Sequence, residues 1–337
     1  MLEHGGNLQE AARRFGRPVQ QWLDLSTGIN PHYYPVPHFS EQAWHRLPEK
    51  MPALSAAAQA FYGAPEMLAV AGTQAAIQAL PRLRLQKNGI ARVVVAAPSY
   101  AEHAHQWRQH GHLVHECAYD ALAAHIATAD VVVVCNPNNP TGETVDAETL
   151  LGWAAQLAGR GGWLIVDEAF GDTVSDLSVA SSTGQAGLIV LRSVGKFFGL
   201  AGVRVGFVAG QHGLLQQLEN MLGPWAISGP AQQITCAALQ DVTWQTATRQ
   251  HLLKQGDRLQ NMLLEHGYTS TGTALFQWCS DAVLQGETER LWLHLAERGI
   301  WVRLFRQAAR GCRFGLPADE AGWQKLSLTL DTWTQNK

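Results

Sequence analysis

An α/β fold, with a mostly parallel sheet in a large domain and a small α+β domain after it, is predicted for this 337-residue chain. Between residues 92 and 209, short apolar runs alternate with helix-like segments, the pattern of a parallel sheet covered on both faces. Beyond that point the alternation stops, and a long helical pattern follows at residues 231–266. We expect an N-terminal arm (residues 1–38), a large domain (39–228) and a small domain (229–337).

Composition narrows the class of protein. With 46% hydrophobic residues the chain can bury a sizeable core, and a formal charge of −3 favours neither nucleic acid nor a membrane surface as partner. Its longest apolar runs, such as residues 131–135, have the length of strands, and the first residues lack the basic and apolar regions of a signal peptide. A cytoplasmic enzyme is therefore expected. The five cysteines contain no Cys-x-x-Cys pair, so neither disulfides nor a zinc site is predicted.

The first third of the chain leads into the sheet. A short helix is predicted at residues 8–15 and a brief strand before Asn30. The proline-rich run at residues 31–37 predicts an extended arm of the kind that crosses to a partner subunit. A helix at 53–62 and an apolar run then precede Gly72-Thr73-Gln74, which open another helix. Backbone N–H groups at such a helix start can bind an anion.

Four predicted strands of the large domain end next to residues capable of chemistry. The strands span residues 92–96, 130–135, 163–166 and 188–191, and the residues that follow them are Tyr100, Asn139, Asp167 and Lys196. Ligands of open α/β sheets bind in the crevice at the carboxyl ends of the strands. We therefore expect these four side chains to converge. The small domain is predicted to contain strands near 274–278, 300–304 and 312–314, with helices at 287–297 and from residue 318.

Lys196 has nearly all small or apolar neighbours in sequence. An amine in such surroundings is expected to lose hydration, which lowers its pKa and makes it a nucleophile toward carbonyl groups, as in Schiff-base chemistry. The alternative is a surface lysine that ends a strand. Ser193 precedes Lys196 by three residues and Arg204 follows it by eight. In this spacing the chain resembles the pyridoxal-phosphate (PLP) enzymes of the aspartate-aminotransferase fold, and the resemblance implies that Lys196 holds PLP as a Schiff base.

The resemblance also implies the other cofactor ligands. Ser193 and Arg204 would bind the PLP phosphate together with Gly72, Thr73 and Gln74. Asp167 opens the motif Asp167-Glu-Ala-Phe170, in which the family aspartate keeps the ring nitrogen protonated. Its alternative is a helix N-cap or turn residue.

Asn139-Pro-Thr-Gly142 and Tyr100 complete the cofactor site that the resemblance implies. Many relatives have tyrosine where Phe170 stands, so the O3′ oxygen of PLP would depend mainly on Asn139. Tyr100 would stack on the ring, although a core tyrosine is an equal alternative. The catalytic residues are therefore expected to be Lys196, Asp167 and Tyr100.

Two clusters of basic residues have different expected roles. Five histidines lie between residues 103 and 115, with spacings that do not place ligands on one helix face, so we expect a polar helix face and no metal site. Arg313 lies where the family keeps the arginine that binds the substrate carboxylate. Arg303, Arg306 and Arg310 are candidates to bind a second anion, and the alternative for Arg306 and Arg310 is a solvated basic edge strand.

Within the family, the chain is most similar to the threonine-phosphate decarboxylases of cobalamin biosynthesis, which themselves resemble histidinol-phosphate aminotransferases. The motifs that carry this resemblance are His4-Gly-Gly-Asn7, Leu25-Ser-Thr-Gly-Ile-Asn30-Pro31, Asp167-Glu-Ala-Phe170, Leu191-Arg-Ser193 and Pro224-Trp225. By resemblance, His4, Gly5, Asn30 and Arg303 would bind the substrate phosphate. Leu47 replaces a tyrosine that reaches the PLP phosphate of the neighbouring subunit in relatives.

The resemblance implies a carboxy-lyase that releases CO₂ from L-threonine O-3-phosphate, with an aminotransferase of the histidinol-phosphate type as the alternative. A homodimer is implied as well, because PLP sites of this fold lie at a subunit boundary. A purely regulatory ligand-binding protein is less favoured, since the sequence contains no helix-turn-helix or basic patch to give it an output.

Overall fold

The computed structural model describes residues 5–307 and 309–335 of the chain. The chain forms two units: unit 1 contains the residues up to 32, residues 139–142 and those from 249 onward, and unit 2 contains residues 33–138 and 143–248. The predicted domain boundaries at residues 38 and 228 stay predictions. In the described part of the chain, no helix combines the length and the apolar composition that a membrane span requires.

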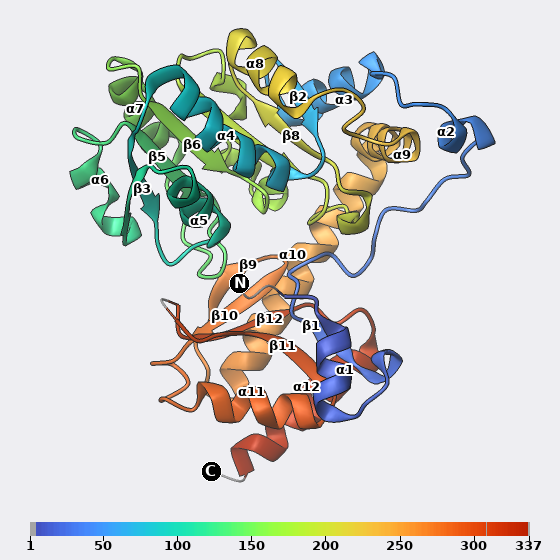
Figure 1. The fold of residues 1–337 in the computed structure, drawn as a ribbon. Helices are drawn as coiled ribbons and strands as arrows, with labels where there is room; N and C mark the ends of the chain where they lie inside the picture. The colour runs from blue at the N-terminus through green and yellow to red at the C-terminus, as the bar shows by residue number, and fades with distance from the viewer. Residues whose placement is uncertain (1–4, 308, 336–337) are drawn as a thin grey trace. The chain divides into compact units, whose positions relative to one another are not determined.

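Unit 2 is built on a seven-stranded sheet with the order β2-β8-β7-β6-β5-β3-β4 (Figure 1). Strands β3 to β7 are mutually parallel, while β8 runs antiparallel to both β7 and β2. The strands are β2 (Met67–Val70), β3 (Arg92–Ala96), β4 (Leu113–Cys117), β5 (Val131–Cys135), β6 (Trp163–Asp167), β7 (Leu188–Ser193) and β8 (Gly206–Ala209). The predicted α/β class with a mostly parallel sheet is confirmed.

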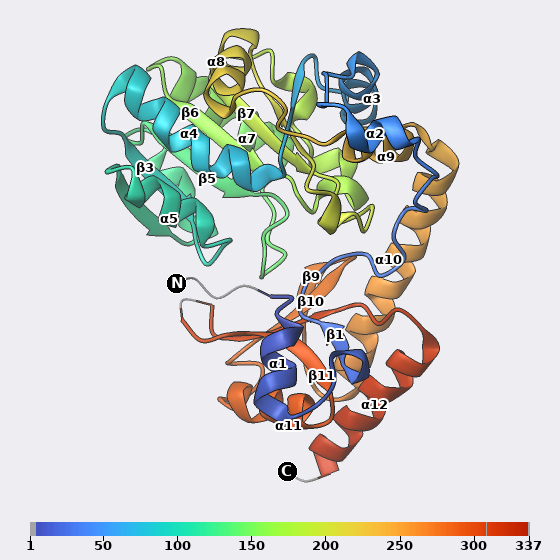
Figure 2. The ribbon, with the colours of Figure 1, turned by 45° about the vertical axis from the view of Figure 1, so that its right-hand side comes forward.

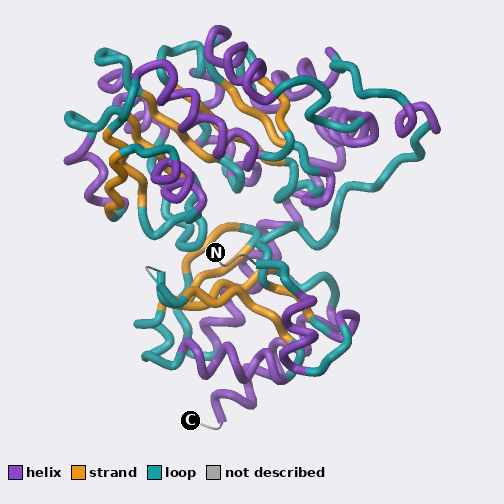
Figure 3. The backbone as a smooth tube through the Cα atoms, viewed as in Figure 1, coloured by secondary structure: helices purple, strands orange, loops and turns teal. Residues whose placement is uncertain are grey.

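The sheet of unit 2 is buried because its central strands are apolar on both faces. Every residue of β5 is buried, as expected for a parallel strand with helices on either side. On one face the core includes residues of α4 (Thr73–Asn88), α5 (Glu102–Gln109) and α8 (His212–Leu222), and α7 (Ala147–Ala158) contacts β6. Figure 3 shows helices and strands alternating through this unit. Its other helices are α2 (Glu41–His45), α3 (Pro52–Tyr62), α6 (Leu122–His125) and α9 (Gly229–Gln240).

Unit 1 contains a five-stranded sheet with the order β1-β11-β12-β10-β9. Only the β1–β11 pair is parallel. Helices α1, α11 and α12 lie together beside this sheet (Figure 2). The elements are α1 (Leu8–Phe15), β1 (Leu23–Leu25), β9 (Thr271–Thr273), β10 (Phe276–Ser280), α11 (Thr288–Glu297), β11 (Ile300–Phe305), β12 (Gly311–Gly315) and α12 (Glu320–Gln335).

Two local predictions were wrong. The single helix expected at residues 231–266 is two helices, α9 and α10 (Val242–Glu265). Asp241 separates them with φ −86° and ψ 79°, and its Oδ1 accepts the backbone N–H of Trp244 at 2.9 Å, so the side chain caps the start of α10. The histidine-rich stretch is not one helix face either, because His115 lies on β4, a strand that the sequence analysis missed.

Candidate functional site

Three neighbouring strands of unit 2 bring the predicted phosphate ligands to one edge of the sheet. Gly206, the first residue of β8, lies opposite Val70 of β2 on one side and opposite Ser193 of β7 on the other. Gly72 comes just after β2, and Arg204 comes just before β8. Residues far apart in sequence are therefore adjacent here because of the order of the strands.

Gly72 and Arg204 lie against each other at the start of α4, and we call them, with the first N–H groups of that helix, the phosphate cradle. Gly72 has φ 72°, and a Cβ atom at this position would lie 2.7 Å from Nη2 of Arg204. Any side chain would therefore displace the guanidinium. Arg204 is itself fixed by a left-handed backbone, with φ 57°, and by donation from Nη1 to the carbonyl of Ala201 at 3.1 Å. Gly72 gives α4 no side-chain cap, so the first N–H groups of this helix can bind an anion such as phosphate.

Lys196 follows β7 in a tight turn. The N–H of Gly195 donates to Oγ of Ser193 at 3.2 Å, which fixes the turn between the serine and the lysine. Nζ of Lys196 lies 5.2 Å from the centre of the Phe170 ring, and the side chain is half-buried. Two buried aromatic residues, Phe197 and Phe198, follow it. The amine thus lies beside the Phe170 ring at the carboxyl end of the sheet.

Asp167 ends β6 and is buried, but it has a partner that the sequence analysis did not foresee. Its Oδ2 lies 2.9 Å from Nε2 of His103, and its Oδ1 accepts the N–H of Ala169 at 3.1 Å. Burial alone would lower the pKa of His103, but Cys135 and Asp167 beside it outweigh burial and raise that pKa to about 10. At neutral pH an imidazolium therefore holds the aspartate. A polar helix face was the wrong expectation for His103, which is 2% exposed.

Tyr100 joins the same edge of the sheet through a short network. Its hydroxyl donates to Oε1 of Gln74 at 3.2 Å, and Nε2 of Gln74 donates to Oε2 of Glu102 at 2.9 Å. Burial, with the Glu102 carboxylate next in importance, raises the pKa of Tyr100 to about 12. The phenol therefore stays neutral and is held beside the start of α4.

In unit 1, Arg313 lies on β12 and is 5% exposed. Nη1 donates to Oδ1 of Asn139, and Nη2 donates to the carbonyl of Ser26 at 2.7 Å. Among the described residues, its Nε has no hydrogen-bond partner. Burial, and after it the nearby Arg303, lowers the pKa of Arg313 to about 9, so the guanidinium stays charged at neutral pH. A buried cation bonded to neutral oxygens is costly, and the nearby carboxylate of Asp24 opposes these two effects on the pKa.

The other arginines of the cluster differ in their partners. Arg303 on β11 lies directly opposite Arg313 in the strand pairing, which doubles the positive charge at this point. Arg306 and Arg310 each lie 3.5 Å from a carboxylate oxygen, those of Glu289 and Asp281 respectively. Its place opposite Arg313 makes Arg303 a candidate to bind an anion together with Arg313.

The loop after β1 approaches the same arginines. The N–H of Gly6 donates to Oγ of Ser26 at 2.8 Å, and a Cβ at Gly5 would lie 2.4 Å from the Ser26 carbonyl that Arg313 also binds. Asn30 is buried, and its Oδ1 accepts the N–H of His32 at 2.9 Å. His4 lies outside the described residues. Gly5 and Gly6 thus lie beside Ser26, whose carbonyl Arg313 binds and which the sequence analysis missed, while a shared substrate role for these residues and Asn30 stays a prediction.

Tyr100, Asp167 and Lys196 all lie in unit 2, at or just after the carboxyl ends of its parallel strands, and their convergence on one ligand stays a prediction. Asn139 belongs to unit 1, so its approach to these three stays a prediction. The residues of unit 2 suit PLP: a cradle for its phosphate, an amine for its aldehyde and a buried carboxylate for its ring nitrogen. The 64-residue separation of His103 from Asp167 left no local signal for that contact.

Comparison with known proteins defines the class. Residues 37–317 match the model of the family described as aminotransferase class I and II. The chain belongs to this family, whose members depend on PLP.

Two relatives match this chain over nearly its whole length. The chain is 50% identical to the threonine-phosphate decarboxylase of Pseudomonas aeruginosa, with 98% of this chain and 97% of that protein covered. It is 42% identical to the threonine-phosphate decarboxylase of Sinorhizobium sp, with the same shares covered. The histidinol-phosphate aminotransferase of Serratia proteamaculans is 30% identical, with 68% of this chain and 66% of that protein covered.

Solved structures agree on the fold. The histidinol-phosphate aminotransferase of Sinorhizobium meliloti, in complex with pyridoxal-5′-phosphate, has a TM-score of 0.84 at 19% identity, covering 100% of this chain and 96% of that one. The L-threonine-O-3-phosphate decarboxylase of Porphyromonas gingivalis has a TM-score of 0.74 at 17% identity, covering 92% and 99%. At such identities the likeness concerns the fold, and it confirms the aspartate-aminotransferase-like architecture.

Proposed function

We propose that this protein is a PLP-dependent carboxy-lyase that converts L-threonine O-3-phosphate to (R)-1-amino-2-propanol O-2-phosphate and CO₂ in cobalamin biosynthesis. The observation that carries this proposal is the 50% and 42% identity, over nearly the whole chain, to two threonine-phosphate decarboxylases. Histidinol-phosphate aminotransferases match at lower identity or over less of the chain.

In this proposal, residues of unit 2 hold the cofactor. Lys196 binds it covalently, while Ser193, Arg204 and the α4 start at Gly72, Thr73 and Gln74 bind its phosphate by charge-assisted hydrogen bonds. PLP, when bound, supplies an electron sink for the bond broken at the substrate Cα. Asp167 keeps the ring nitrogen protonated, and the imidazolium of His103 keeps Asp167 ionised and in place. Tyr100 stacks on the ring.

Asn139 of unit 1 is proposed as a further ligand of PLP. Its Oδ1 accepts from Arg313, so its amide nitrogen is the atom left to donate to the O3′ oxygen of PLP. Phe170, unlike tyrosine, has no hydroxyl for that task. This assignment explains why an asparagine suffices where many relatives add a tyrosine.

Residues of unit 1 bind the two anionic ends of the substrate in this proposal. Arg313 binds the α-carboxylate, and Arg303 binds the phosphate with Asn30, Gly5 and His4. Two charge-assisted anchors would hold the substrate in one orientation, and that orientation would decide which bond at Cα is broken. We infer that the carboxylate bond is selected, so CO₂ leaves with the bond broken and a proton is added at Cα. An aligned Cα–H bond would give transamination instead.

The direct test is incubation of the holoenzyme with L-threonine O-3-phosphate while CO₂ release is measured. We expect stoichiometric CO₂ and a phosphorylated amine without any keto acid present. Histidinol phosphate with 2-oxoglutarate is the paired control. Amino transfer to 2-oxoglutarate without CO₂ release would assign the chain to the aminotransferase alternative.

Replacing Arg303 by methionine is expected to weaken binding of threonine phosphate by about 10- to 100-fold, because one charge-assisted hydrogen bond contributes about 1.5–3 kcal/mol. Binding of plain threonine should change little, because threonine has no phosphate for Arg303 to contact. Dissociation constants come from titrating the cofactor absorbance. Arg310→Met is the matched control, since Arg310 lies beside Asp281. Equal losses for both amino acids would contradict the phosphate role. The same selectivity is expected for His4→Ala and Asn30→Ala.

We propose a homodimer in the cytoplasm. Large apolar side chains are exposed on neighbouring elements of unit 2: Trp44 at 70%, Leu47 at 65% and Trp225 at 59%. Helix α2, which carries Trp44, lies close against α9. A Cβ atom at Gly229 of α9 would be only 2.5 Å from the carbonyl oxygen of Ala43 on α2. An exposed apolar patch of this kind suits a subunit interface.

Replacing Trp44 by glutamate is therefore expected to weaken dimerisation by on the order of 100-fold, the effect of removing an aromatic hot spot. Sedimentation velocity over a concentration series measures the change. Leu328→Glu alters a side chain on α12 that is exposed to a similar degree, 65%, and should leave the dimer intact. A wild-type protein that is monomeric throughout the series would refute the interface.

A further inference from the structure

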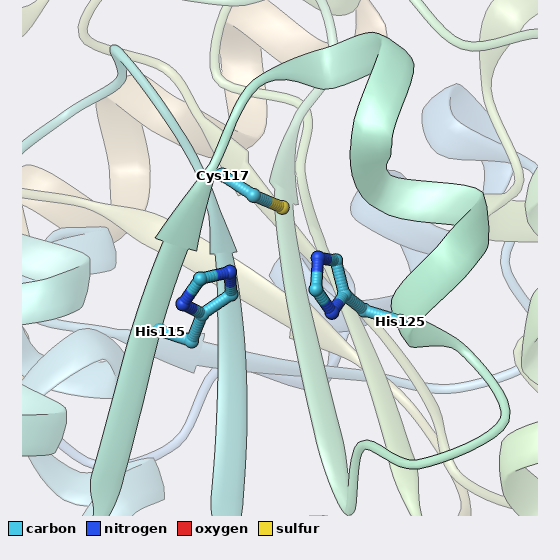
Figure 4. Close-up of side chains that lie close together, drawn as sticks. All are labelled: His115, Cys117 and His125. Atoms are coloured by element: carbon cyan, nitrogen blue, oxygen red, sulfur yellow. The ribbon is translucent and has the colours of Figure 1, made fainter.

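A group of metal-binding side chains lies at the edge of the unit 2 sheet, outside the proposed cofactor site. His115 and Cys117 come from strand β4, and His125 comes from helix α6 (Figure 4). One ligand atom from each, an imidazole nitrogen or the thiol sulfur, lies within 4.8 Å of the other two. The ring centres of the two histidines are 4.7 Å apart.

The fold explains why these three residues meet. Side chains at positions i and i+2 of a strand point to the same face, so His115 and Cys117 lie side by side. Glu116 between them points to the other face, where its carboxylate binds Arg108 at 2.5 Å. After β4 the chain turns through residues 119–121 into α6, and His125 ends this helix facing the strand (Figure 4).

The chemistry of the group suits zinc. Imidazole nitrogens and a cysteine sulfur are the ligands that Zn²⁺ prefers, at about 2.0–2.1 Å and 2.3 Å. Tetrahedral geometry then requires the ligand atoms to be roughly 3.3–3.6 Å apart. A change of side-chain rotamer, above all at the exposed His115 on the edge strand β4, can bring the ligand atoms to that spacing.

Access and charge also favour a cation. His115 is exposed and the other two side chains are half-buried, so an ion can enter and retain a water molecule as its fourth ligand. Among the described residues, neither imidazole makes a side-chain hydrogen bond that the ion would have to break. The carboxylate of Asp120 lies near the Cys117 thiol and attracts a metal cation.

A second group with the same types of ligand provides a contrast. His103, Cys135 and Asp167 are all buried, and the imidazole and carboxylate of that group already bind each other. It belongs to the cofactor site described above. The group on β4 has no such internal pairing.

We propose that His115, Cys117 and His125 form a zinc-binding site, with water as the fourth ligand, that ties the edge strand β4 to α6. Binding removes the thiol proton of Cys117 to solvent as the Zn–S bond forms, with no change in oxidation state. The proposal does not depend on which reaction the enzyme catalyses.

Cobalt(II) is the spectroscopic probe for this site. Untagged holoenzyme, freed of excess cofactor, is titrated with Co²⁺, and we expect one equivalent to produce a sulfur-to-cobalt charge-transfer band with the visible bands of a tetrahedral ion. Zn²⁺ should displace the cobalt. Competition against a chromophoric chelator gives the zinc affinity, and release of about one proton per ion is expected from the thiol.

Variants identify the ligands. Cys117→Ser should abolish the charge-transfer band and the released proton, and His125→Ala should lower zinc affinity at least about 100-fold. Glu116→Gln, on the opposite face of the same strand, and His110→Ala, a nearby histidine, should bind like wild type. Circular dichroism checks that each variant is folded. A band that survives in Cys117→Ser, or equal affinity in His125→Ala and His110→Ala, would overturn the proposal.

Discussion

Replacing Lys196 by alanine is expected to slow turnover at least about 10³-fold and to prevent covalent retention of PLP. In the proposed function the lysine would combine two tasks, since its amine would hold the cofactor and would also serve as a general acid–base group. Loss of a general acid–base group alone costs roughly 10²–10⁴-fold. The measurement is borohydride reduction followed by peptide mapping, together with the rate of CO₂ release.

Lys87→Ala is the matched control, because Lys87 is exposed on α4 in the same unit. It should retain the reducible adduct and full activity. The prediction fails if Lys196→Ala protein still yields a reduced adduct within the turn that follows β7. Such a result would point to another amine and would separate the cofactor's presence from the role of Lys196.

The sheet of unit 2 was predictable because its strands are short apolar runs that end in polar residues. Strand β5 is valine at four consecutive positions, and burial on both faces demands that composition. Strand β4 was not predictable by the same rule. As an edge strand it is largely exposed, and its sequence Leu-Val-His-Glu-Cys has no continuous apolar run.

Because strand β4 was missed, the sequence analysis also gave no reason to expect the metal site that we now propose. A spacing of two residues excludes a shared helix face, and on that basis no metal site was expected. On a strand, the same spacing places His115 and Cys117 side by side. The third proposed ligand, His125, was outside the set of histidines considered. It comes close to His115 and Cys117 only because the chain turns back from β4 into α6.

Candidate site residues that belong to motifs could be predicted from the sequence, whereas candidates that are recognised only by their tertiary contacts could not. Ser193, Lys196 and Arg204 belong to one short segment of the chain. Their spacing can therefore be recognised from the sequence without knowledge of the rest of the fold. His103 and Ser26 act through residues distant in sequence, Asp167 and Arg313 respectively. Nothing local to either residue indicates its partner.

Asp167→Ala is expected to retain PLP but to slow turnover on the order of 100-fold or more, as loss of a preorganised electrostatic group does. The phosphate cradle and Lys196 are untouched by this change, so cofactor content should remain near that of wild type. Near-normal activity would exclude a role for Asp167 at the ring nitrogen.

In the proposed site His103 acts through Asp167, so His103→Gln is expected to slow turnover less, by about tenfold. That factor corresponds to the loss of one hydrogen bond worth about 1.5 kcal/mol, the upper end of the usual net contribution. Its signature is the pH profile. Because the pKa of His103 is raised to about 10 from its ordinary value near 6.5, its charge supports Asp167 below that pH and is lost as pH rises through 10. Wild type should therefore lose rate on that alkaline limb, while His103→Gln, which never carries the charge, should not. His105→Ala, half-buried on the same helix, should keep the wild-type profile. An identical alkaline limb in wild type and His103→Gln would show that the histidine serves packing alone.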